Sequence, residues 1–161
     1  MVVKVKDNGY DSYFKAVKDL NGSGIKVGLL AAVGDKVLTK GIVNEFGTSR
    51  AGRGGNVTIP ERSFIRSTYN RNYKKVSKRF GQIFGSFTKK NYAVIPKLKL
   101  IGLEQENETK KTITDMKSPP NKKSTIAAKG SSHPLIDTGE LRSKISSEVI
   151  KKWVALENHW Q

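Results

Sequence analysis

Apolar residues recur at helical spacing along the segment that follows Ser63. They fall at steps of three and four, which puts them on one stripe of a helix, and we expect this stripe to be buried. From Arg62 to Lys90 the segment contains no Asp or Glu, so we expect the solvent face of the helix to be uniformly positive. The stripe consists of Ile65, Tyr69, Tyr73, Val76, Phe80, Ile83, Phe84 and Phe87.

The chain before this helix changes between helical and extended patterns. Residues 10–20 carry apolar side chains at helical spacing, and the Asn-Gly-Ser-Gly run after them favours a helix end. Ile25, Val27 and Leu29 alternate as in a half-buried strand. A short helix is then expected to end at Gly47.

The segment 48–56, TSRAGRGGN, has no large apolar residue to anchor it. We expect a flexible basic loop, which is either an arm that reaches a neighbouring subunit or DNA phosphates, or a solvated linker. Arg50 and Arg53 are the residues that would make such contacts. Pro60 and Ser63 then suit the start of the long helix, since proline presets the backbone and serine caps a helix.

The region after the long helix predicts a second one over residues 91–117, which Pro119 and Pro120 end. Further on, Asp137 and Glu140 stand three residues apart ahead of an apolar stretch. This spacing resembles a capping box with aspartate as the cap, and it predicts the start of another helix.

The pattern as a whole predicts one α+β domain over residues 1–161, with a small antiparallel sheet packed against the long amphipathic helix and shorter helices, and with long loops. The segment at about 91–123 is interpreted as a helical insertion. The closing stretch, which holds Val149 and Trp153, is expected to pair with the strand near Val27.

Composition adds a strong charge to this picture. The chain has 161 residues, enough to bury the core of one domain, and its formal net charge is +16. Such a charge implies an acidic partner, either nucleic acid or acidic protein. The lack of cysteine excludes disulfides, thiolate nucleophiles and cysteine metal sites. Because every apolar run is shorter than a membrane span, we expect a soluble protein without a membrane partner.

Candidate chemistry is sparse. The two histidines, His133 and His159, lack a second histidine three or four residues away, so no metal or cofactor is expected. Asp137 and Glu140 are interpreted as a helix cap rather than as a general acid and base. Ser131 and His133 are interpreted as loop residues rather than as a nucleophile and its base. We therefore expect a protein that is not an enzyme.

Contact with phosphates is the main alternative suggested by charge. The basic helix face has the electrostatic character of a DNA-binding surface, but its aromatic residues are expected on the buried stripe. No motif for sequence-specific readout occurs, so only non-specific DNA binding is considered. The candidate residues for a subunit or DNA interface are Arg50, Arg53, Arg66, Arg71, Lys74, Lys75, Lys78 and Arg79.

Three short segments together resemble a known family: VNEFGT at 43–48, IPERSFIR at 59–66 and STIAAKGSSHPLIDTGELRSKI at 124–145. They are similar to the tail-completion or neck proteins of long-tailed bacteriophages and Mu-like prophages, the phage virion morphogenesis family. In that family the elements NEFG, IPxRPFLR and PLxDTGxLxxSI come in this order. The resemblance extends from about residue 25 to residue 149.

The resemblance implies an α+β fold that assembles as a homo-oligomeric ring at the junction of head and tail. Such a protein would be a structural, non-enzymatic part of the virion neck, assembled in the bacterial cytoplasm. Its partners would be the adaptor, the head-closure protein, the tail terminator or the tail tube, with non-specific contact to packaged DNA. The alternatives are a tail-terminator or head-closure role in the same neck, and, in a different class, a non-specific DNA-binding protein.

The resemblance also implies scaffold roles for the residues that match its motifs. Two departures, Ser63 in place of proline and Lys144 in place of a frequent serine, leave the helix-capping logic intact. Gly47 and Gly139 would make turns, and Pro60 and Arg62 would start the long helix. Phe46, Phe64 and Leu141 would be apolar anchors, and Glu45, Asp137 and Thr138 complete the set.

Overall fold

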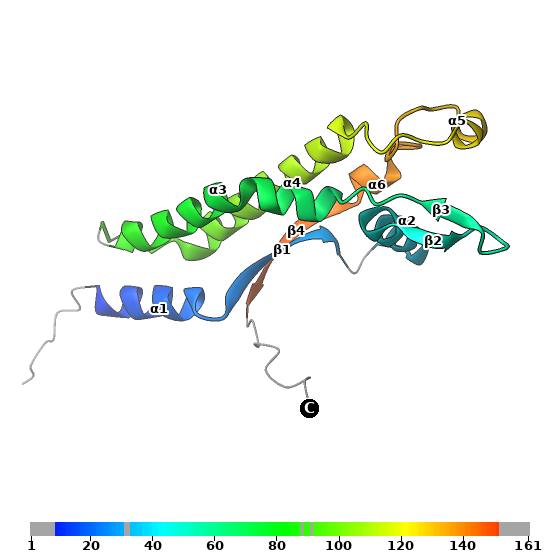
Figure 1. The fold of residues 1–161 in the computed structure, drawn as a ribbon. Coiled ribbons are helices and arrows are strands. Elements are labelled where there is room, and N and C mark those ends of the chain that lie inside the picture. Colours follow the sequence, from blue (N-terminus) through cyan, green and yellow to red (C-terminus); the bar gives the residue numbers. More distant parts are fainter. Residues whose placement is uncertain (1–8, 31–32, 88, 91, 152–161) are drawn as a thin grey trace, which may run out of the picture.

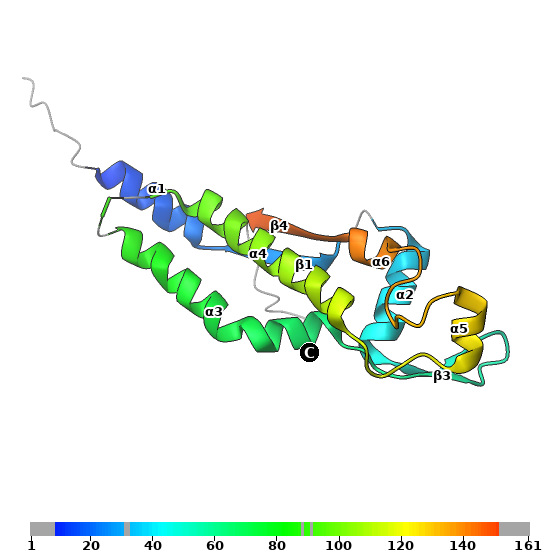
Figure 2. The same ribbon diagram turned by 90° about the horizontal axis from the view of Figure 1, so that it is seen from above.

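The computed structural model describes residues 9–30, 33–87, 89–90 and 92–151, and it confirms a mixed α+β fold. The long helices lie above a narrow antiparallel sheet, and the smaller elements gather at one end (Figures 1 and 2). The elements in chain order are α1 (Tyr10–Leu20), β1 (Ser23–Leu29), α2 (Asp35–Phe46), β2 (Thr48–Ala51), β3 (Val57–Ile59), α3 (Phe64–Phe87), α4 (Val94–Asp115), α5 (Lys123–Lys129), α6 (Glu140–Ser143) and β4 (Ile145–Lys151).

The central sheet consists of β1 and β4, paired antiparallel. Val27 lies opposite Ser147, and Ile25 lies opposite Val149, which confirms the pairing predicted from the alternating pattern. Trp153, which was expected in the same final strand, lies outside the described residues. The sheet is therefore two strands wide across the described part of the chain.

Helix α4 lies at the centre of the fold, against both strands and against α3 (Figure 2). Its apolar residues Leu98, Ile101 and Ile113 are buried. Gly102 permits close contact with the sheet, since a Cβ there would lie 3.2 Å from Ile25 and 3.3 Å from Ser147. The helix expected over 91–117 is thus confirmed, but its interpretation as an insertion is wrong, because the core is built around it.

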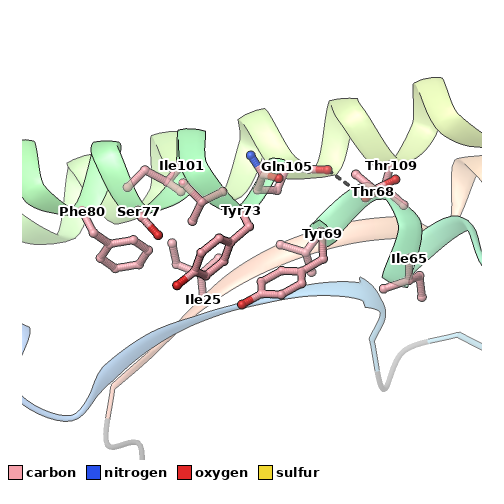
Figure 3. A pocket seen from close by; sticks show the side chains of 12 residues that line it. Ile25, Ile65, Thr68, Tyr69, Tyr73, Ser77, Phe80, Ile101, Gln105 and Thr109 are labelled. Atoms are coloured by element: carbon pink, nitrogen blue, oxygen red, sulfur yellow. Dashed lines mark hydrogen bonds between the residues drawn. The ribbon is translucent and has the colours of Figure 1, made fainter. Parts of the chain in front are cut away.

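The apolar stripe of α3 differs from the expectation that it is buried. Tyr69 and Tyr73 are 57% and 54% exposed, and of the stripe only Ile83 is fully buried. The reason is that α3 packs sideways on α4 through polar residues: Thr68 Oγ1 lies 2.6 Å from Thr112 Oγ1. The part of the stripe from Ile65 to Phe80 lines an open groove beside β1 (Figure 3), whereas Ile83 is buried against α4.

The segment expected as a flexible loop contains a strand. β2 pairs antiparallel with β3, with Thr48 opposite Ile59 and Ala51 opposite Val57. Gly52 and Gly55 adopt positive φ angles and form the turn. The resulting β2–β3 hairpin projects from the body of the molecule at the right of Figure 1.

The capping box expected at Asp137 is also wrong in detail. Gly139, with a φ of 79°, is the N-cap of the four-residue helix α6. The hydroxyl of Thr138, rather than the carboxylate of Asp137, accepts a hydrogen bond of 3.4 Å from the backbone N–H of Glu140. The turn role of Gly139 is confirmed, and Leu141 is buried as an apolar anchor.

Gly102 provides a test of this packing. We expect Gly102→Val to lower the free energy of unfolding by about 1–3 kcal/mol, because the added carbons overpack the joint between α4 and the sheet. Gly81→Ala is the matched control, since the space around Gly81 in α3 is open. It should raise stability by up to about 1 kcal/mol. Urea denaturation measures both variants, and a shift in the same direction would contradict this packing.

Candidate interaction surface

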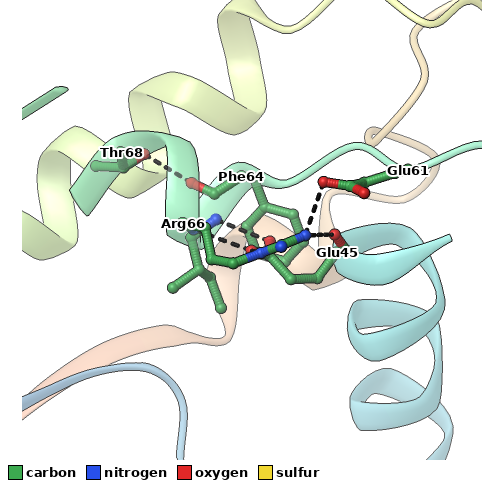
Figure 4. A network of polar contacts seen from close by, with 6 residues as sticks. Glu45, Glu61, Phe64, Arg66 and Thr68 are labelled. Atoms are coloured by element: carbon green, nitrogen blue, oxygen red, sulfur yellow. Dashed lines mark hydrogen bonds and ion pairs between the residues drawn. The ribbon is translucent and has the colours of Figure 1, made fainter. Parts of the chain in front are cut away.

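The N-terminus of α3 is capped by a carboxylate from another helix. Glu45, near the end of α2, is only 4% exposed. Its two carboxylate oxygens accept hydrogen bonds of 2.9 Å from the backbone N–H groups of Ile65 and Arg66 (Figure 4). These N–H groups have no partner within the first turn of a helix, and the positive end of the helix dipole favours the negative charge. Glu45 therefore fixes α2 against α3.

Arg66 reinforces this cap from the solvent side. Its Nη2 donates to the Glu45 carbonyl at 2.9 Å and to Glu61 Oε1 at 2.7 Å. The guanidinium also lies 4.8 Å from the centre of the Phe46 ring, a cation–π contact. Phe46 is 60% exposed, so its expected role as a buried anchor is wrong. Arg66 is occupied within the chain and is a poor candidate for an external contact.

Arg62 joins three segments in a buried position. Its guanidinium donates to the carbonyls of Pro119 and Pro120 at 2.8 and 3.1 Å, and to the side chains of Asn44 and Asn121, both at 3.2 Å. Burial lowers the pKa of Arg62, and these four acceptors compensate for the loss of water around its charge. Arg62 is thus a clamp rather than only a residue that starts the helix. Sequence reasoning missed Asn44 and Asn121, although Asn44 precedes Glu45 within VNEFGT.

Gly47 is required where α2 turns into the hairpin. Its φ is +70°, and a Cβ there would lie 2.8 Å from the backbone nitrogen of Glu61. The backbone N–H of Arg62 donates to the Asn44 carbonyl at 2.6 Å just beside it. Pro60 lies between β3 and α3, as expected. The hairpin is therefore held at its base on both sides.

A buried cluster joins the second and third of the segments that carry the family resemblance, and the Glu45 cap attaches the first. Phe64 of IPERSFIR is fully buried, as the sequence predicts. It shares a core with residues of the third segment, which lies about 70 positions further along the chain. Glu45 of VNEFGT caps the helix that Phe64 begins. The buried members of this cluster are Val37, Phe64, Ile113, Leu135, Leu141 and Ile145.

The basic face of α3 is not unbroken, because α4 supplies acidic partners. Arg79 pairs with Glu104 at 2.7 Å, and Lys75 lies 3.8 Å from Glu108. Arg71 donates to the Thr112 hydroxyl at 2.6 Å. Four predicted interface cations, all exposed, make no side-chain ion pair or hydrogen bond with any described residue. They are Arg50 and Arg53 on the hairpin and Lys74 and Lys78 on α3.

A groove of about 410 Å³ opens between β1 and α3 on another side of the molecule (Figure 3). Its lining is mainly aliphatic and aromatic, with a few neutral polar groups, and tyrosine is the only ionisable type present. This surface suits the docking of an apolar segment rather than acid–base chemistry. The lining residues are Ile25, Val27, Ile65, Thr68, Tyr69, Tyr73, Val76, Ser77, Phe80, Ile101, Gln105 and Thr109.

The residues considered for catalysis have structural contacts. His133 Nε2 lies 2.7 Å from the Thr114 carbonyl, and Ser131 accepts a hydrogen bond from the backbone of His133 rather than from its ring. Glu140 pairs with Lys40 at 3.6 Å. Within the described part of the chain, no group of His, Asp and Glu side chains is arranged to hold a metal ion, and no helix has the length and apolar character of a membrane span.

Comparisons with protein-family models, curated proteins and solved structures find no match to this chain. The resemblance to phage neck proteins therefore remains a prediction.

The cap by Glu45 can be tested by removing each acceptor of Arg66 in turn. We expect Glu45→Ala to lower the free energy of unfolding by about 2–3 kcal/mol, because two helix N–H groups and a guanidinium lose a buried acceptor. Glu61→Ala is the control: this carboxylate binds the same arginine but is 52% exposed, so its loss should cost less than about 1 kcal/mol. An equal loss of unfolding free energy in the two variants, measured by thermal or urea denaturation, would contradict the claim that Glu45 contributes more than Glu61.

Proposed function

We propose that this chain is a structural subunit of the phage neck or tail end, where it joins the tail to the head connector as part of a ring. The observation that supports the proposal is that the three segments contact one another: IPERSFIR shares a buried cluster with STIAAKGSSHPLIDTGELRSKI, and Glu45 of VNEFGT caps the helix that IPERSFIR begins. Glu45 links the first segment to the second, and Phe64 links the second to the third. These contacts support reading the three segments as one structural signature rather than as unrelated short matches.

The engagement of ionisable groups favours a scaffold over an enzyme. Within the motif segments, Glu45, Arg62 and Arg66 are used in hydrogen bonds that join one segment of the chain to another. Catalytic groups would instead converge on a cleft. The main groove is lined by apolar and neutral residues, which suits assembly with other protein chains.

The predicted interface cations that pair with no described residue suggest the class of partner. Arg50, Arg53, Lys74 and Lys78 are available to acidic surfaces of the adaptor, head-closure protein, tail terminator or tail tube, or to packaged DNA. A tail-terminator or head-closure role in the same neck differs from this proposal only in which neighbouring ring the chain would contact. Non-specific DNA binding is the alternative of another class, and the same four cations favour it.

Charge reversal tests the proposed role. We expect Lys74→Glu combined with Lys78→Glu to leave the fold intact but to lower the joining of tails to heads by about tenfold or more, since each reversed charge opposes an acidic partner. Counts of joined particles in electron micrographs measure this. Lys117→Glu with Lys123→Glu is the control: both lysines are exposed, the change in net charge is the same, and neither lies on α3.

Locating the chain in or outside virions distinguishes a structural neck protein from a DNA-binding protein. Antibody labelling of purified virions should mark the junction of head and tail. A chain that is absent from virions but retains duplex DNA on a filter, with retention that falls steeply as salt rises, would replace the neck role with DNA binding. Normal particle yield from the α3 variant would also count against the proposal.

A further inference from the structure

We infer that the groove beside α3 receives the β2–β3 hairpin of a second copy, which extends the central sheet at the free edge of β1. This inference rests on the ring role proposed above and names the contact that would build the ring. The chain carries both halves of this contact, and they lie at different places on the molecule (Figure 1).

The free edge of β1 is the first half of the argument. β1 pairs with β4 on one side, and no described strand pairs with its other side. Helix α4 covers the two strands, whereas α3 lies beside α4 on the β1 side of the sheet (Figure 2). The part of the α3 stripe from Ile65 to Phe80 therefore lies beside an edge of β1 at which no described strand pairs. An unpaired edge beside an apolar face is a template for strand addition.

The space beside β1 and under α3 limits which segment of a second copy can bind there. A helix is about 10 Å across, and strands in a sheet lie about 4.8 Å apart, so one helix can cover about two strands. A second copy cannot fill this room by pairing its own β1 edge with this one. Its α3 overhangs the same space, and the two helices would overlap. A hairpin that projects from the body of its own copy fits without this conflict (Figure 1).

The β2–β3 hairpin has the required form. Val57 is 45% exposed, and Ile59 lies on the same face of β3 because side chains two positions apart share a face. These two side chains can cover Tyr69 and Tyr73 of the groove. The hairpin of the same copy is excluded, since it is fixed at its base beside Gly47 and points away from the groove (Figure 1).

The size of the contact explains why it would build a ring. Twelve residues line the groove, and the hairpin offers about as many, which is roughly half of the 20–30 residues a side of a standard interface. A single contact is therefore weak. Because donor and acceptor differ, the association is head-to-tail, and every copy inside the assembly makes two contacts. Such a contact gives a ring when the rotation between copies closes and an open filament when it does not.

Charge sets the conditions under which copies associate. Each copy carries a formal net charge of +16, so copies repel one another at low ionic strength. Added salt screens this repulsion and leaves the apolar contact in place. Self-association through this groove should therefore strengthen with salt, whereas binding to DNA weakens with salt.

Disulfide trapping tests the contact directly, since the natural chain has no cysteine. Full-length Val57→Cys is mixed with Tyr73→Cys, or with Ser77→Cys one turn further along the groove, and oxidised at high salt. We expect a mixed dimer in both cases. Lys74→Cys is the matched control, since it adjoins Tyr73 in sequence but is not part of the groove lining. Equal trapping at residue 74, or disulfides between two Val57→Cys chains, would overturn the inference.

A second pair of variants tests the energetics without cysteines. Val57→Asp should raise the concentration at which oligomers form by about tenfold or more, because a carboxylate would be buried unpaired. Thr58→Asp lies on the opposite face of the same strand and should have a much smaller effect. Sedimentation velocity measures both, and circular dichroism confirms that they fold. Equal effects of the two changes would overturn the inference.

The outcomes separate this contact from the proposed function. Oligomers that persist in Val57→Asp, without mixed disulfides, would mean that a different surface builds the ring, which overturns the inference and leaves the neck role standing. A chain that stays monomeric at every salt concentration and is absent from virions would overturn both.

Discussion

The placement of α3 depends on a buried carboxylate at its N-terminus. The first turn of any helix leaves backbone N–H groups unpaired, and here Glu45 supplies the acceptor from the preceding helix. The burial of this charge is tolerated because two N–H groups and Arg66 share it. With α2 and α3 joined in this way, the hairpin between them becomes a fixed projection, and the stripe of α3 is carried past the edge of β1.

Local structure could be predicted well from the sequence, because local signals determine it. The bounds of α1 agree with the apolar spacing of residues 10–20, and the alternation around Val27 identified a strand and its partner. The cap at Glu45 could not be predicted, since its acceptor lies 20 positions from the N–H group of Ile65. β2 was mistaken for part of a loop because it is short and has no large apolar residue, and its pairing with β3 depends on two glycines at the turn.

The environment of the long helix was harder to predict for a related reason. A periodic stripe shows that side chains share a face, but it does not show that the same chain covers that face. Thr68 and Asn72 occupy the seam with α4, so polar residues are buried while Tyr73 is exposed. The expectation of an unbroken basic face on α3 was wrong for the same reason, since Glu104, the acidic partner of Arg79, lies on a separate helix.

The two surfaces of α3 that we propose for binding lie on different faces of the helix. Lys74 and Lys78 are outside the groove that Tyr69 and Tyr73 line, so an acidic partner and a second copy can bind at once. An acidic partner would neutralise part of the charge that keeps copies apart, and binding that favours the assembled state promotes assembly by mass action. Under the proposed role, isolated copies would stay apart in dilute solution, and the ring would close where an acidic surface gathers them.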